Sequence, residues 1–188
     1  GVGCMEANTT GDNNVAVGYL ALDANTTGAD NLAVGKGSLQ ANTTASYNTG
    51  VGANALFTNS TGDKNTALGY NSLVANTTAS NNTAVGHLAL TANTTGHSNT
   101  AVGQSALGVV TTTNHNTAIG FNCLASNTTG EVNTAIGSRA LDANTTGYAN
   151  IAIGFDAMGA ATTGDRCIGI GTYALDAVLT GNDNTAVG

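Results

Sequence analysis

The chain alternates short apolar runs with polar corners, and the same alternation returns along its whole length. A run of the form Asn-Thr-Ala-Val-Gly is followed by Ala-Leu and then by Asn-Thr-Thr-Gly. The glycine that closes the first run recurs at every seventeenth position from Gly18 to Gly188. Self-similarity at a fixed period is the signature of a repeat architecture.

The repeat makes the whole chain one array. A short atypical first repeat covers residues 3–18, and ten 17-residue repeats cover residues 19–188. We therefore expect a single repeat array over residues 1–188. Because the motif continues to both ends of the sequence, we expect it to be a segment of a longer fibre.

Each repeat predicts one coil of a parallel β-solenoid. Thr-Ala-Val alternates with period two, as a strand does, and no stripe of helical periodicity indicates a helix. We expect an all-β fold of about eleven coils, with one strand over Asn-Thr-Ala-Val and a second around Ala-Leu. The first corner is glycine in every repeat, whereas the second becomes Ala45, Ala79 and Thr113, so only the first is expected to need a glycine conformation.

Two apolar columns are predicted to form the core. Val, Ile or Leu precedes each closing glycine, and Leu or Met follows it by four positions. The position between Thr and Val holds only Ala or Gly, so we expect close packing against that face, by neighbouring chains. The predicted core residues are Val17, Leu22, Val34, Leu39, Leu68, Leu73, Val85, Leu90, Val102, Leu107, Ile119, Leu124, Ile136, Leu141, Ile153, Met158, Ile170 and Leu175.

Asparagine marks two further columns. Stacked coils place equivalent residues ~4.8 Å apart, and identical amides at this spacing can hydrogen-bond along the stack. The first predicted ladder, before the strand, contains Asn31, Asn48, Asn65, Asn82, Asn99, Asn116, Asn133 and Asn150. The second, at the Asn-Thr-Thr-Gly corner, contains Asn25, Asn42, Asn59, Asn76, Asn93, Asn127 and Asn144.

Composition narrows the function. Charged residues make up 8% of the chain, against about 25% in average proteins, and no catalytic or phosphate-binding motif occurs at a meaningful spacing. We therefore expect neither an enzyme nor a cofactor. The net charge of −7 argues against nucleic acid as a partner. No apolar stretch approaches the ~20 residues of a membrane span, so we expect no membrane insertion by this segment.

The motif resembles those of known fibrous proteins. Asn13–Gly18 and Ala149–Gly154 resemble the Asn-Ser-Val-Ala-Ile-Gly signature of the head repeats in trimeric autotransporter adhesins. The longer unit, as in Asn82–Gly96, is similar to arrays in phage tail-fibre and bacterial surface fibre proteins. The resemblance covers the whole chain and implies a left-handed β-roll, three chains side by side as a homotrimer. Adhesin head repeats are commonly shorter than this unit, so we expect the extra residues to enlarge a corner.

These observations favour a structural fibre or stalk segment of an extracellular appendage, on a cell surface or a virion, which provides reach and stiffness. The scarcity of large apolar side chains favours self-association, and strand edges without caps favour end-to-end stacking into a filament.

Two alternatives stay open. The first is an adhesin head that binds a host or matrix ligand through a rim of aromatic and imidazole side chains. The rim residues are Tyr19, Tyr70, His87, Phe121 and Phe155. The second is an ice-binding β-solenoid that uses Thr pairs such as Thr26-Thr27, although adjacent residues of a strand face opposite sides and only one column can point outward.

The remaining motifs have plainer interpretations. The Asn-x-Thr sequences at the corners are expected to be turns rather than glycan acceptors. Cys4, Cys123 and Cys167 stand in three different columns without metal-ligand spacing, so we expect free thiols. His97 and His115 occupy neighbouring corner columns, but no third ligand accompanies them and no metal site is expected.

Overall fold

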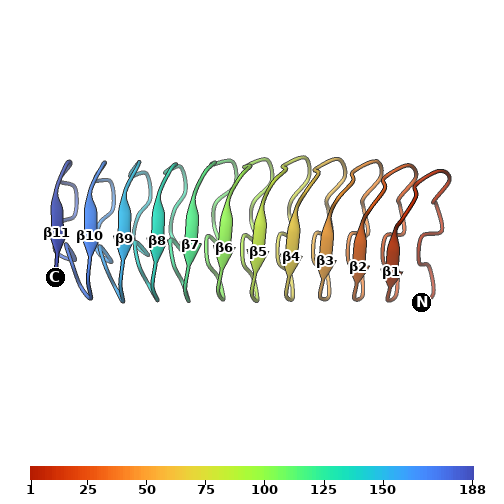
Figure 1. Ribbon diagram of the computed structural model, residues 1–188, viewed down its shortest axis with the longest axis horizontal. Helices are drawn as coiled ribbons and strands as arrows, with labels where there is room; N and C mark the ends of the chain where they lie inside the picture. Colours follow the sequence, from red (N-terminus) through yellow and green to blue (C-terminus); the bar gives the residue numbers. More distant parts are fainter.

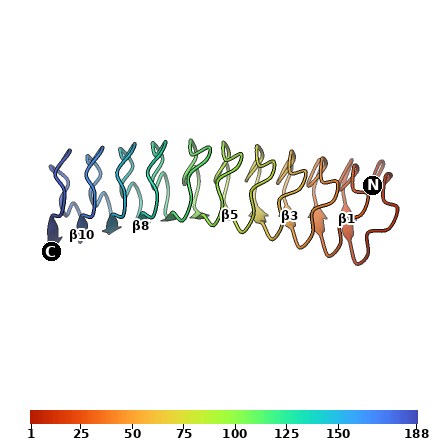
Figure 2. The ribbon, with the colours of Figure 1, turned by 90° about the horizontal axis from the view of Figure 1, so that it is seen from above.

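The computed structural model describes residues 1–188 as a rod of stacked coils (Figure 1). The chain advances by one coil per repeat, and the two termini lie at opposite ends of the rod (Figure 2). There are no helices, and 11 three-residue strands form one parallel sheet in chain order. The strands are β1 Val15–Val17, β2 Leu32–Val34, β3 Thr49–Val51, β4 Thr66–Leu68, β5 Thr83–Val85, β6 Thr100–Val102, β7 Thr117–Ile119, β8 Thr134–Ile136, β9 Ile151–Ile153, β10 Ile168–Ile170 and β11 Thr185–Val187. The predicted β-solenoid is confirmed.

The register of the sheet follows the sequence repeat. Thr83 of β5 pairs with Thr100 of β6, and Val85 pairs with Val102, so each partner lies one repeat further along the chain. Columns that share a residue type in the sequence therefore become straight columns along the rod. Since every strand N–H is needed by a neighbouring coil, the absence of proline from the chain has a physical reason.

The Ala-Leu segment forms a turn, so the prediction of a second strand in each coil was wrong. Leu20 and Leu22 have φ angles of 53° and 54°, in the left-handed region that non-glycine residues seldom adopt. These angles interrupt the extended backbone that a strand requires. The turns nevertheless bond from coil to coil, as the Leu22 amide does to the Ser38 carbonyl at 3.0 Å. Only 20 of the 117 backbone hydrogen bonds lie within strands, so the turns carry most of the stacking.

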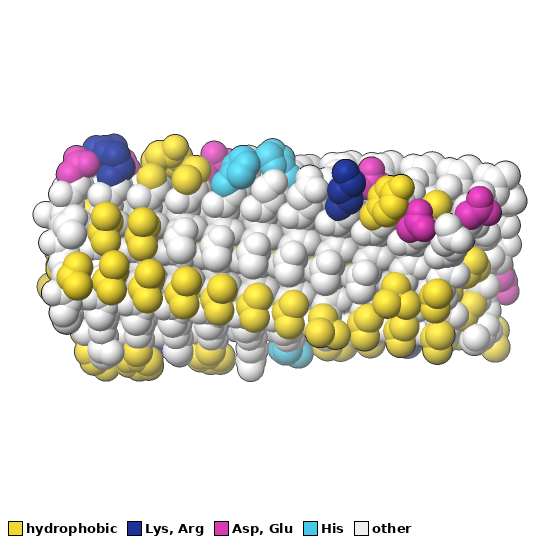
Figure 3. All heavy atoms as spheres, viewed as in Figure 1, with side chains coloured by type: hydrophobic (Ala, Val, Ile, Leu, Met, Phe, Trp, Pro, Cys, Tyr) yellow, Lys and Arg dark blue, Asp and Glu magenta, His cyan; other side chains and the backbone are white.

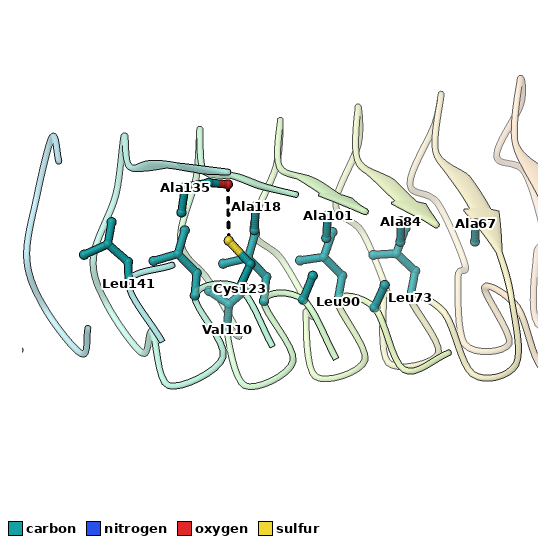
Figure 4. Packing of buried hydrophobic residues seen from close by; sticks show 14 of the residues in the cluster. Ala67, Leu73, Ala84, Leu90, Ala101, Val110, Ala118, Cys123, Ala135 and Leu141 are labelled. Atoms are coloured by element: carbon teal, nitrogen blue, oxygen red, sulfur yellow. Dashed lines mark hydrogen bonds between the residues drawn. The ribbon is translucent and has the colours of Figure 1, made fainter. Parts of the chain in front are cut away.

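The interior is a thin core of one Leu column and two small-residue columns (Figure 4). Leu90, Ala84 and Ala89 are all fully buried and represent the three columns. Met158 takes the place of Leu in one coil and is also buried, whereas Leu175, near the C-terminal end, is only partly buried. The prediction for the Leu column therefore holds in all coils except that of Leu175.

The Val column was also predicted to be core, and this was wrong: its side chains leave the outer face of the sheet. The corrected residues are Val17, Val34, Leu68, Val85, Val102, Ile119, Ile136, Ile153 and Ile170, which are exposed or partly exposed. The strand turns its middle residue inward because the interior has little room. A methyl group added at Gly50 would lie 2.5 Å from Oγ of Ser38 and 3.4 Å from Cγ of Leu39, and one at Gly169 would lie 2.7 Å from Cγ of Met158. The small-residue face is thus packed by the chain's own leucines and not by a neighbouring chain.

The two corners differ in their need for glycine, as predicted. Gly86, at the first corner, has a φ of 137°, and a Cβ atom there would lie 2.5 Å from the Gly103 carbonyl oxygen. The next coil approaches the second corner as closely, with 2.1 Å between a Cβ at Gly62 and the Ala79 carbonyl oxygen, so the positive φ is what distinguishes the first corner. Glycines of the second corner do not have a positive φ, which is why Ala and Thr can replace them.

A replacement at the second corner still has a structural cost. The second Thr of the corner usually donates its amide to the next coil, as Thr61 does to the Thr77 carbonyl at 3.2 Å. Thr44, Thr78 and Thr112 lack this bond, and each directly precedes a corner that carries a side chain. The added Cβ therefore separates adjacent coils slightly at that point.

Candidate functional site

The outward face of the sheet is the most extensive candidate surface. Each strand directs its first and third residues outward and its middle residue inward, as β5 shows with Thr83, Ala84 and Val85. Two outward columns therefore run along the rod, separated by the buried Ala column. All eleven strands contribute to both columns.

The third-residue column is entirely apolar. It consists of Val, Ile or Leu in every strand, and Val17 is 56% exposed while Leu68 is 47% exposed. Figure 3 shows this column as a hydrophobic row that crosses the molecule from end to end. At a strand spacing of ~4.8 Å the row is roughly 50 Å long. A continuous apolar surface of this extent is typical of an interaction site.

The first-residue column adds β-branched and apolar side chains beside this row. It contains Thr in seven strands and apolar residues in the remaining four, which are Val15, Leu32, Ile151 and Ile168. Neither outward column contains a charged residue. We call the two columns together the apolar sheet face; charged side chains gather instead along the edge of the rod (Figure 3).

The two Asn ladders hold the coils that carry this face in register. In the first ladder, the backbone N–H of Asn82 donates to Oδ1 of Asn65 at 3.0 Å, and the side-chain Nδ2 of Asn82 donates to the Gly96 carbonyl at 2.8 Å. In the second ladder, Nδ2 of Asn76 donates to Oδ1 of Asn59 at 2.7 Å. These side chains are fully buried and hydrogen-bonded, so each rung ties one coil to the next.

All five predicted rim residues are exposed, in the column that follows the first-corner glycine, which we call the ridge. Few of their rings contact one another. The Tyr70 and His87 rings stack with centroids 5.5 Å apart. Phe155 instead contacts Tyr173, edge to face at 5.5 Å, and the Arg139 guanidinium lies 5.4 Å from its ring centroid. The same position carries Lys36 and Gln104 in other coils, so the ridge is chemically mixed.

The Thr pairs present a single outward row, as expected. The Thr26 hydroxyl donates to the Thr43 carbonyl at 3.0 Å and is engaged within the stack. Thr27 is exposed, and so is the equivalent residue of every other coil.

The cysteines form no disulfide, and the cysteines and histidines form no metal-binding cluster. All three cysteines are free; Cys123 and Cys167 are buried, and burial raises the pKa of the Cys123 thiol to about 12. The His97 and His115 rings approach edge to face at 5.2 Å, but no group of three His, Cys, Asp or Glu side chains could hold a metal ion.

Seven of the corner asparagines in the glycosylation-like sequences are fully buried, in agreement with their interpretation as turns. The seven are Asn25, Asn42, Asn59, Asn76, Asn93, Asn127 and Asn144.

Ion pairs between adjacent coils were not predicted. Arg139 pairs with Asp156, and Arg166 pairs with Asp183 through two bonds of 2.7 and 2.8 Å. The Arg166 guanidinium lowers the pKa of the Asp183 carboxyl. Each pair joins an arginine to an aspartate one repeat further along the chain, so both pairs could have been predicted from the 17-residue period.

The surface contains no pocket. No helix of the structure is long and apolar enough to cross a lipid bilayer. No family model, curated protein or solved structure matches the chain.

Proposed function

We propose that the chain is a structural segment of an extracellular fibre, on a cell surface or a virion appendage, and that it acts as a homotrimer. The apolar sheet face is the observation that carries this proposal. It is continuous along the rod, contains no charge, and has nothing to cover it in a single chain. Burying apolar surface is the main favourable contribution to protein association, so other copies of the same rod are the natural cover for a face of this length.

Stiffness follows from the way the coils are joined. The parallel strands, the turns and both Asn ladders bond each coil to its neighbours along the array. Contacts that repeat along one direction give a quasi-one-dimensional scaffold. Such a rod suits reach and display better than catalysis, for which a concave site is the usual requirement. The number three comes from the resemblance to trimeric fibre proteins, and end-to-end stacking stays a prediction.

Light scattering tests the self-association. We expect a solution mass near three times the 18.4 kDa of one chain. Val102→Lys places a charge in the middle of the apolar sheet face and should reduce the mass to that of one chain, with an unchanged far-ultraviolet circular dichroism spectrum. Thr95→Lys, on a corner outside the sheet, is the matched control and should leave the mass of the assembly unchanged. A wild-type chain that stays monomeric would contradict the proposal.

The exposed ridge favours a second function, that of an adhesin head. Stacked Tyr70 and His87 offer a flat aromatic surface of the kind that sugars and other ring-containing ligands contact. This function requires saturable binding of a host or matrix ligand at the ridge, whereas a purely structural fibre requires none.

A further inference from the structure

The Asn-Thr-Thr-Gly corner is bonded to the next coil in nearly the same way along the rod. The first Thr of the corner donates both its amide and its hydroxyl to the equivalent carbonyl of the next coil. Thr77 makes these two bonds to the Thr94 carbonyl at 3.0 and 3.1 Å. The corner Asn adds a side-chain bond to its equivalent in the preceding coil, as Asn93 does to Asn76 at 3.1 Å.

The two bonds of the first Thr are missing at one place. Neither the amide nor the hydroxyl of Thr111 bonds to the Thr128 carbonyl, although the residue at every other such position from Thr9 to Thr162 makes both bonds. The amide of Thr112 lacks its forward bond as well, so no backbone hydrogen bond joins residues 108–113 to residues 125–130. We call this gap between the two segments the seam.

Two departures from the repeat account for the seam. Val110 stands where the corner ladder has Asn, and Oδ1 of Asn93 is therefore buried without a hydrogen-bond partner. On the other side, Nδ2 of Asn127 keeps only its bond to the Gly130 carbonyl. Thr113 stands where most corners have glycine, and at the equivalent Gly96 an added Cβ atom would lie only 2.3 Å from the carbonyl oxygen of the next coil. The first change removes bonds, and the second holds the coils apart.

The seam is confined to one side of the rod. The Leu107 amide still donates to the Cys123 carbonyl at 3.1 Å, at the turn that precedes the seam. Beyond it, Nδ2 of Asn116 donates to the Gly130 carbonyl at 3.0 Å, and β7 pairs with β8 in the normal register. The sheet therefore stays closed while the opposite corner is open.

We propose that the seam is a hinge of the fibre, at which the corner of residues 108–113 opens locally while the sheet keeps the two halves of the rod joined. Local opening is governed by how many bonds and packed contacts a segment must break. This corner has lost its forward bonds to the next coil, and its neighbours on both sides have lost a rung of the Asn ladder. Bending and local opening of the array therefore concentrate here rather than being spread evenly.

Native-state hydrogen exchange, measured on the assembled protein, tests this hinge at amides that do have partners. The amides of Thr94 and Thr95 bond to the Thr111 carbonyl, so opening of residues 108–113 exposes them. We expect them to exchange about tenfold faster than those of Thr26 and Thr77, which bond in the same manner elsewhere. Equal protection at all four positions would overturn the proposal.

Two double variants complete the test: one restores the repeat sequence at the seam, and the other introduces the seam residues into an intact corner. Val110→Asn with Thr113→Gly restores the repeat and should slow the exchange of Thr94 to that of Thr77. Asn59→Val with Gly62→Thr places the same two changes in an intact corner and should accelerate Thr43, whose amide bonds to the Ser60 carbonyl. If the repaired chain keeps fast exchange at Thr94, or the transplant leaves Thr43 unchanged, the seam residues do not make a hinge.

Discussion

Two adjacent rungs of the corner ladder should respond very differently to the same substitution. Asn76 and Asn93 are both fully buried, and each donates Nδ2 to the preceding Asn and to its own corner carbonyl. They differ on the acceptor side. Oδ1 of Asn76 accepts a bond from Asn93, whereas Oδ1 of Asn93 has no partner, because Val110 follows it in the column. We predict that Asn76→Ala destabilises the protein more than Asn93→Ala.

The magnitude follows from the bonds each change removes. Both substitutions remove two donated bonds and leave one buried acceptor unpaired, on Asn59 or on Asn76. Asn76→Ala also removes the bond from Asn93, worth about 1 kcal/mol. Asn93→Ala instead eliminates an acceptor that is already unpaired, and such a group costs roughly 1–3 kcal/mol. The free energy of unfolding should therefore fall by roughly 2–4 kcal/mol more for Asn76→Ala.

Urea unfolding followed by circular dichroism measures this difference, with all variants at one protomer concentration because association contributes to stability. The same comparison in a Val110→Asn background provides a second test. This substitution gives Oδ1 of Asn93 a donor, so in this background the cost of Asn93→Ala should rise towards that of Asn76→Ala. Equal costs of the two substitutions in the wild-type chain, or no coupling between positions 93 and 110, would refute the argument that the missing rung leaves the Asn93 acceptor unpaired at a cost in stability.

Two further predictions concern the corners and the core. Gly86→Ala should cost more than about 3 kcal/mol in unfolding free energy, since it forces a side chain onto a positive φ as well as against the Gly103 carbonyl. At Gly130 a Cβ atom would approach the Gly147 carbonyl as closely, at 2.4 Å, but the φ is not positive and other corners accommodate Ala or Thr. Gly130→Ala should therefore cost about 1 kcal/mol, the loss of one hydrogen bond, and similar costs in urea unfolding would contradict the distinction between the corners. Cys123 is buried, its thiol donates to the Ala135 carbonyl at 3.2 Å, and burial raises its pKa to about 12. We therefore expect iodoacetamide at about pH 8 to alkylate it at least roughly tenfold more slowly in the native protein than in urea, and rapid native labelling of the Cys123 peptide by mass spectrometry would count against this.

The sequence alone was sufficient to predict the 17-residue period, the register of the sheet and the two Asn ladders. An Asn at every seventeenth position can only meet its equivalents if the coils stack in register, and Asn65 and Asn82 do so. The glycine of the first corner was also predictable, because no other residue type ever replaces it. In both cases one chemical requirement acts identically in every coil, so the repeat itself reveals it.

Other features could not be predicted from the residue pattern. Leu gives no sign of left-handed backbone, since its side chain disfavours that conformation, yet Leu90 has a φ of 50°. The interruptions at Val110 and Thr113 are visible in the sequence, but the loss of the Thr111 bonds is not, because it depends on how far the next coil is displaced. The sequence placed Tyr70 and His87 in the same column, but the stacking of their rings is visible only in the structure.

The sequence predicted the Val column inside the rod, whereas the structure places the Ala column inside and the Val column outside, and this difference has a general physical origin. A strand of period two fixes which residues share a face but leaves two assignments of that face to the interior. In β5 both Ala84 and Val85 are apolar, so hydrophobicity does not choose between them. Space does: each coil encloses a single Leu, and only a methyl group fits opposite it. The large β-branched side chains are then necessarily outside. A chain with few large side chains in its core thus carries a continuous column of large apolar side chains on its surface, and this supports the proposed association of rods.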